Sequence, residues 1–101
     1  MEIVRELPLR TLLAQVESAE ETVWGAFEST QMSQAREAVY HLYRSVEDEP
    51  QLSPSVKEEL LPLLLEARSA IAAGETPWER VQACHTRLAK VQHLIQQMLA
   101  H

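Results

Sequence analysis

One cysteine and four histidines are the residues of this chain best suited to act as nucleophiles, metal ligands or proton carriers. Cys84 lies in an apolar stripe with helical spacing, and Arg80 and Arg87 lie about one turn away. A cysteine becomes a reactive thiolate beside a cation or at a helix N-terminus, whereas in an apolar stripe it behaves as a small hydrophobic residue. We therefore interpret Cys84 as part of the core.

The histidines lack the spacing of a metal site. His85 and His93 are eight residues apart on one predicted helix, which turns their side chains about 80° away from each other. Metal-binding pairs on a helix are three or four residues apart. No set of residues elsewhere in the chain completes a ligand shell around either histidine. We predict neither a metal nor another cofactor.

A second group of residues resembles a known catalytic motif. Arg36, His41 and Tyr43 follow an Arg-x4-His-x-Tyr spacing. This spacing resembles the motif of HEPN-domain ribonucleases and their toxin relatives, which are also helical bundles. The resemblance implies that Arg36 and His41 bind and cleave RNA, generally in a dimer, together with Tyr43. It covers eight residues, and Glu37 stands where the family usually has Asn or Asp.

The charge of the chain disfavours an RNA substrate. The net charge is −6, and residues 1–49 carry all of the imbalance, with ten acidic residues and four arginines. Phosphate groups of nucleic acids and of anionic membranes repel such a surface. A basic protein would be attracted to it, although an acidic surface also serves solubility alone. We predict no nucleic-acid partner and no membrane partner, and keep the ribonuclease as the alternative function.

The composition indicates one small all-α domain that spans residues 1–101. Hydrophobic residues make up 46% of the chain and there are only two glycines, while the abundant Leu, Ala, Glu and Gln favour helices. A single cysteine excludes an intrachain disulfide. The first residues do not resemble a secretory signal, and no apolar run reaches the ~20 residues that cross a membrane. We expect a cytoplasmic protein.

Apolar residues recur with helical spacing in four segments, which lie at about residues 9–28, 33–47, 55–73 and 77–99. Short connections between consecutive helices predict an antiparallel four-helix bundle. Its core is expected to contain Leu9, Leu12, Leu13, Val16, Val23 and Phe27 from the first segment, Ala35, Val39, Leu42 and Val46 from the second, Val56, Leu60, Leu63, Leu64, Ala67 and Ile71 from the third, and Val81, Cys84, Leu88, Val91, Ile95 and Met98 from the fourth.

The signals for helix ends differ in strength along the chain. Residues 48–54 contain two prolines and predict a loop, and Gly74 predicts the end of the third helix. Thr76, Pro77 and Glu79 have the spacing of a capped helix start. Ser55 and Glu58 form a second candidate capping box, and Pro8 is expected in the first turn of the first helix.

The break between the first two helices has the weakest signal. Residues 29–33 are polar but contain neither Gly nor Pro. We favour a turn there, because a turn lets the two apolar faces close on each other. The alternative is a three-helix bundle in which the first two helices are fused.

The functional prediction is a non-enzymatic protein-interaction or scaffold module that acts through exposed helical faces as a homodimer. Trp24, Tyr40 and Tyr43 lie near the apolar stripes, and Leu94 and Leu99 widen the stripe of the fourth helix. Tryptophan and tyrosine are enriched at the centres of protein interfaces. We therefore predict these five residues as the surface that binds a protein partner.

Overall fold

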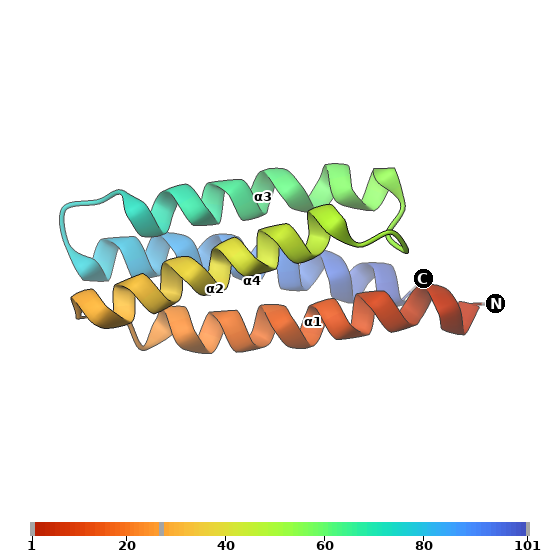
Figure 1. The fold of residues 1–101 in the computed structure, drawn as a ribbon, viewed down its shortest axis with the longest axis horizontal. Helices are drawn as coiled ribbons and strands as arrows, with labels where there is room; N and C mark the ends of the chain where they lie inside the picture. The colour runs from red at the N-terminus through yellow and green to blue at the C-terminus, as the bar shows by residue number, and fades with distance from the viewer. Residues whose placement is uncertain (1, 27, 101) are drawn as a thin grey trace.

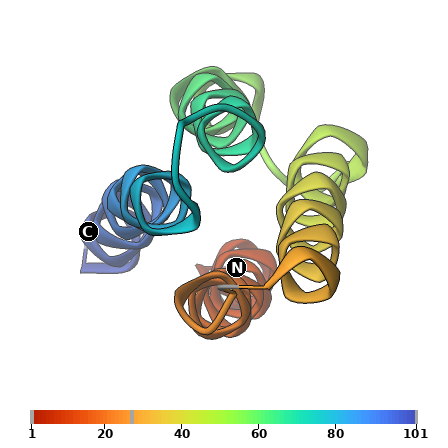
Figure 2. The same ribbon diagram turned by 90° about the vertical axis from the view of Figure 1, so that its left-hand side faces the viewer.

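The computed structural model describes residues 2–26 and 28–100, and the side chains of residues 7–26, 28 and 31–100. These residues form the helices α1 (Glu2–Trp24), α2 (Ser29–Asp48), α3 (Pro54–Ala72) and α4 (Pro77–Ala100), and no β-strand. The helices run alternately up and down, so the start of α1 and the end of α4 lie at the same end (Figure 1). In the end-on view they occupy the corners of a square, with α1 beside α4 (Figure 2). The predicted four-helix bundle is confirmed.

The core consists of one apolar stripe from each helix. The predicted positions in α2 are all buried, and those in α4 are buried except for Met98, which packs partly buried against the core. Leu13, Val56 and Leu63 are also partly buried, and Phe27 lies outside the described residues. The buried set is Leu9, Leu12, Val16, Ala19, Val23, Ala26, Met32, Ala35, Val39, Leu42, Val46, Leu52, Leu60, Leu64, Ala67, Ile71, Val81, Cys84, Leu88, Val91 and Ile95. Exclusion of these side chains from water drives the helices together.

The turn between α1 and α2 lies earlier than the sequence predicts. α1 ends at Trp24 and α2 begins at Ser29, so residues 29–33 belong to the first turns of α2. The Gly25 amide donates to the Glu21 carbonyl at 3.2 Å, which closes α1, and the Glu28 amide donates to Gln31 Oε1 at 3.3 Å, which starts α2. A glycine has low helix propensity, and a glutamine at the third helical position caps a helix start. The fused-helix alternative is wrong.

Two other helix starts also differ from prediction. α1 extends back to Glu2, so Pro8 lies inside the helix rather than in its first turn, and α1 lacks the hydrogen bond that the missing Pro8 amide would donate. α3 is capped by Ser53, whose Oγ accepts from the Val56 amide at 3.3 Å. The predicted cap at Ser55 is wrong, because Pro54 occupies the first helical position, where its lack of an amide costs no hydrogen bond.

Gly74 and Thr76 define the turn from α3 to α4. The φ angle of Gly74 is +143°, a conformation that side chains with a Cβ rarely adopt. Thr76 Oγ1 accepts from the Glu79 amide at 3.2 Å, as predicted, while Glu79 Oε2 accepts from the Glu75 amide rather than from that of Thr76. Arg80 Nε donates to the Gly74 carbonyl at 3.0 Å and ties the turn to the first turn of α4.

The two glycines give a matched test of this turn. A Cβ on Gly74 would lie 2.9 Å from Arg80 Cγ, whereas the nearest atom to a Cβ on Gly25 would be the Glu21 carbonyl oxygen at 3.7 Å. We expect Gly74→Ala to lower the free energy of unfolding by about 1–3 kcal/mol. Gly25→Ala should leave it unchanged or raise it by about 0.4–1 kcal/mol. Urea denaturation followed by far-UV circular dichroism measures both, and equal effects would contradict this account of the turn.

Candidate functional site

The residues that resemble a ribonuclease motif lie on different sides of α2. Arg36 lines an open groove of about 570 Å³ between α2 and α3. His41 lines another groove, between α1 and α2, and Tyr43 packs partly buried against the core. Because α2 stands between the two grooves, a single chain does not bring the Arg36 guanidinium and the His41 imidazole to one reacting atom.

The residues predicted to bind a partner do not form one surface. Trp24 and Tyr40 are exposed on different helices, while Tyr43, Leu94 and Leu99 are partly buried and pack against the core. The regular apolar stripe of α4 likewise faces the interior of its own bundle. Its spacing therefore reflects packing within one chain. The partner-binding role of these residues stays a prediction, which the exposed rings of Trp24 and Tyr40 fit best.

Trp24 lies against two aromatic residues of α4. Its ring centroid is 5.7 Å from that of Trp78 and 4.8 Å from that of His85, and the ring planes are tilted by 60° and 52°. Trp24 and Trp78 are 47% and 48% exposed, whereas His85 is partly buried. We call these three rings the tryptophan patch. It forms because the end of α1 and the start of α4 meet at one end of the bundle.

A carboxylate and an amide hold the tryptophan patch from the side of the core. Glu20 Oε2 lies 3.7 Å from His85 Nε2. With its amide oriented to donate, Gln92 gives hydrogen bonds of 2.7 and 3.2 Å to the two Glu20 oxygens. Burial raises the pKa of Glu20 above its usual value, while the charge of His85 opposes this and that of Glu17 adds to it. Spacing along the sequence does not reveal this set, because its members come from different helices.

The Glu20–His85 pair has the composition of an acid–base dyad, but the neighbouring cysteine is not available as its nucleophile. A carboxylate beside an imidazole fixes the orientation of the ring, which serves proton transfer in enzymes. The adjacent thiol of Cys84 is completely buried, and burial raises its pKa to about 12 against the smaller opposing effect of Arg87. The thiol is therefore protonated and shielded at neutral pH, in agreement with the predicted core position of Cys84.

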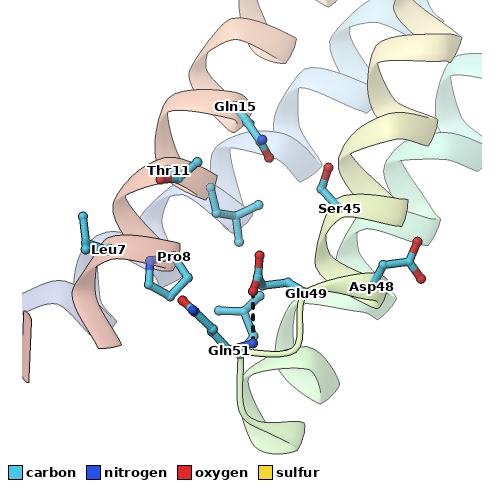
Figure 3. Close-up of a pocket in the computed structure, with 10 residues that line it drawn as sticks. Leu7, Pro8, Thr11, Gln15, Ser45, Asp48, Glu49 and Gln51 are labelled. Carbon is cyan, nitrogen blue, oxygen red and sulfur yellow. Dashed lines mark hydrogen bonds between the residues drawn. The ribbon is translucent and has the colours of Figure 1, made fainter. Parts of the chain in front are cut away.

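An open notch of about 360 Å³ lies between α1 and the α2–α3 loop, at the end of the bundle opposite the tryptophan patch (Figure 3). Two carboxylates line it, and both have partners nearby. Glu49 Oε1 accepts from the Gln51 amide at 3.0 Å, which is the dashed line in Figure 3. Asp48 Oδ2 lies 3.4 Å from Arg44 Nη2. The notch is a feature of loop packing, since its charged groups already stabilise the loop and the end of α2.

Comparison with known proteins gives no assignment, since no family model, curated protein or solved structure matches this chain. In the part of the chain that the structure describes, no three His, Cys, Asp or Glu residues gather where they could hold a metal ion. The helices of that part also lack any stretch long and apolar enough to cross a membrane. The tryptophan patch, with two half-exposed tryptophan rings in contact, is the candidate functional site.

The raised pKa of Glu20 predicts a stability that depends on pH. A carboxyl whose pKa is higher in the folded state than in the unfolded chain binds its proton more tightly when folded, so its charged form destabilises the fold above that pKa. We expect Glu20→Gln to raise the free energy of unfolding at neutral pH. The gain should shrink as the pH falls through the raised pKa, and vanish below the ordinary value of 4.5.

Urea denaturation at several pH values measures this gain, and Glu21→Gln, at an exposed neighbouring position, is the matched control. Glu21→Gln should change stability little at every pH. A loss of stability in Glu20→Gln at neutral pH would mean that the hydrogen bonds from Gln92 and the attraction to His85 outweigh the cost of burying the carboxylate.

Proposed function

We propose that this protein is a non-enzymatic protein-interaction module that binds a basic segment of a partner protein on its tryptophan patch. The observation that carries the proposal is the contact between Trp24 and Trp78, two half-exposed rings 5.7 Å apart. An aromatic side chain of this kind buries about 150–250 Å² when it is enclosed, so the pair leaves a large apolar area in water. Tryptophans in such positions dominate the energetics of many interfaces.

The charges around the tryptophan patch support a basic partner. Within four residues of either tryptophan the chain has five acidic residues and one basic residue. The acidic residues are Glu20, Glu21, Glu28, Glu75 and Glu79, and the basic residue is Arg80. Arg80 donates to the Gly74 carbonyl and so stays tied to the turn. Carboxylates around exposed rings attract lysine and arginine side chains, which then stack on the ring faces.

The contacts behind the rings support a preformed binding surface. Trp24 touches Trp78 and His85 together, and His85 in turn lies beside the Glu20 carboxylate. Rings that are already restrained lose less conformational entropy when a partner covers them. The same contacts give Glu20 and His85 a positioning role, which accounts for an acid–base pair without a nucleophile beside it.

A lysine- and arginine-rich peptide titrated into the protein tests the proposal directly. Because the patch contains both tryptophans of the chain, binding should change the intrinsic tryptophan fluorescence in a saturable manner. We expect a dissociation constant of about 1–100 µM, a range that suits a small exposed site. Binding should weaken as salt is added, since the attracting charges are at the surface.

Two controls make the titration specific to the tryptophan patch. A peptide in which glutamate replaces each basic residue should not bind. By calorimetry, Trp24→Ser/Trp78→Ser should bind the basic peptide at least about tenfold more weakly, while Tyr40→Ser, which removes an exposed ring from another face, should bind it as the wild type does. Equal affinity for both peptides, or unchanged affinity in the folded double variant, would refute the proposal.

A further inference from the structure

The face formed by α2 and α3 has a positively charged end. Arg36 and Arg68 both line the groove of about 570 Å³ between these helices, together with Glu37. Arg68 Cζ lies 4.9 Å above the centre of the Tyr40 ring. Among the side chains of residues 7–26, 28 and 31–100, neither arginine forms an ion pair with a carboxylate. Both guanidinium groups are exposed to water in a chain of net charge −6 and are available to an acidic group of a partner.

The opposite end of the same face is acidic. Arg44 lies 3.3 Å from Glu47 and 3.4 Å from Asp48, so one cation is shared by two carboxylates. Lys57 donates to the Glu47 carbonyl at 2.9 Å, and Glu58 is exposed in the first turns of α3. Residues 44–59 contain five acidic and two basic residues. The face therefore carries opposite excess charge at its two ends.

The middle of this face is apolar and exposed to water. Tyr40 and Leu65 are 40% and 48% exposed and line the same groove from α2 and α3. Along α2, exposed residues follow the alternating spacing of four and three that helices use to pack against a partner helix. These residues are Ser33, Glu37, Tyr40, Arg44 and Glu47. This stripe is separate from the buried stripe of α2, which faces the core.

We propose that a second copy of this chain docks on the α2/α3 face, with α2 antiparallel to α2 and α3 antiparallel to α3 of the second copy. The two-fold axis lies in the interface and runs perpendicular to the helices. It places each residue of a helix opposite the residue of the same helix in the second copy that is equally far from the axis on the other side. On α2 an axis between residues 41 and 42 brings Arg36 to Glu47 of the second copy and Glu37 close to its Arg44. Opposite charges then meet at both ends of α2.

The charges on α3 favour an axis close to that of α2. An axis at Leu63 brings Arg68 to Glu58 of the second copy. The contacts of Tyr40 with Arg68 and of Glu47 with Lys57 place Leu63 at about the height of residue 43 of α2, so the axis positions on the two helices lie within about 3 Å of each other along the bundle. One axis therefore satisfies both helices and places Tyr40 and Leu65 near the centre, where apolar residues contribute most to an interface.

The size of the face suits a modest dimer. A helix of this length is about 30 Å long, and the bundle is 20 Å wide, so the face offers about 600 Å² per copy, near the lower limit for a specific interface. The exposed pairs of Arg44 with Glu47 and Asp48 hold little free energy and can exchange partners. The interface is separate from the tryptophan patch, so this inference stands or fails independently of the proposed function.

Sedimentation velocity of the full chain at about 10–100 µM, a range that matches such an interface, tests the inference. We expect a mass of about twice 11.5 kDa. Arg36→Glu should raise the dissociation constant of the dimer at least about tenfold, because the two-fold axis makes two copies of the lost Arg36–Glu47 pair. Arg36→Glu/Glu47→Arg on the same chain should restore affinity to within about threefold, since each swapped pair is rebuilt across the axis.

Matched variants distinguish a specific interface from a general effect of net charge. Lys90→Glu changes the net charge as Arg36→Glu does but lies exposed on α4, and it should leave the dimer intact. Arg68→Glu and Arg68→Glu/Glu58→Arg should repeat the loss and the rescue on α3. Trp24→Ser/Trp78→Ser should remain dimeric. A monomer throughout the concentration range, a dimer indifferent to Arg36→Glu, or a failed rescue in variants with native circular dichroism would overturn the inference.

Discussion

The packing of α4 against α1 closes the square of helices, and the arrangement of every surface depends on it (Figure 2). Val23 near the end of α1 and Val81 near the start of α4 are completely buried. Further buried aliphatic residues follow along both helices, among them Val16 of α1 and Leu88 of α4. Each square ångström of apolar surface removed from water contributes about 25 cal/mol. Because this contact joins the two ends of the chain, it also determines that Trp24 meets Trp78.

The apolar stripes could be predicted from the sequence, whereas the helix ends could be predicted only where the signal is strong, as at Gly74 and Thr76. Burial produces a strong signal in the sequence, since buried apolar residues such as Val39 and Leu88 recur with the period of the helix. Helix ends depend on alternatives that differ by about 1 kcal/mol or less. Ser53 and Ser55 are both plausible caps, and Pro54 between them favours Ser53. The first turn lies at Gly25 rather than at residues 29–33, because Glu28 and Gln31 provide a new helix start just after the glycine.

The candidate site was predicted only in part, for a geometric reason. Trp24 was predicted to bind a partner from its position beside an apolar stripe, but Trp78, His85 and Glu20 gained their roles from contacts between helices, which spacing along one helix does not reveal. Arg36 and His41, in contrast, are close in the sequence but are not brought together by the structure. Residues five apart on a helix point about 140° away from each other, so a sequence spacing that resembles a catalytic motif places them in separate grooves.

The two proposed surfaces lie on opposite edges of the square, the tryptophan patch where α1 meets α4 and the dimer face on α2 and α3 (Figure 2). Occupying one therefore leaves the other open. In a dimer joined through α2 and α3, two tryptophan patches would face outward, away from the axis. A partner with two basic segments could then engage both, and the second contact would form at a high effective concentration. The two tryptophan patches of a dimer would in this way bind such a partner with higher affinity than one patch alone.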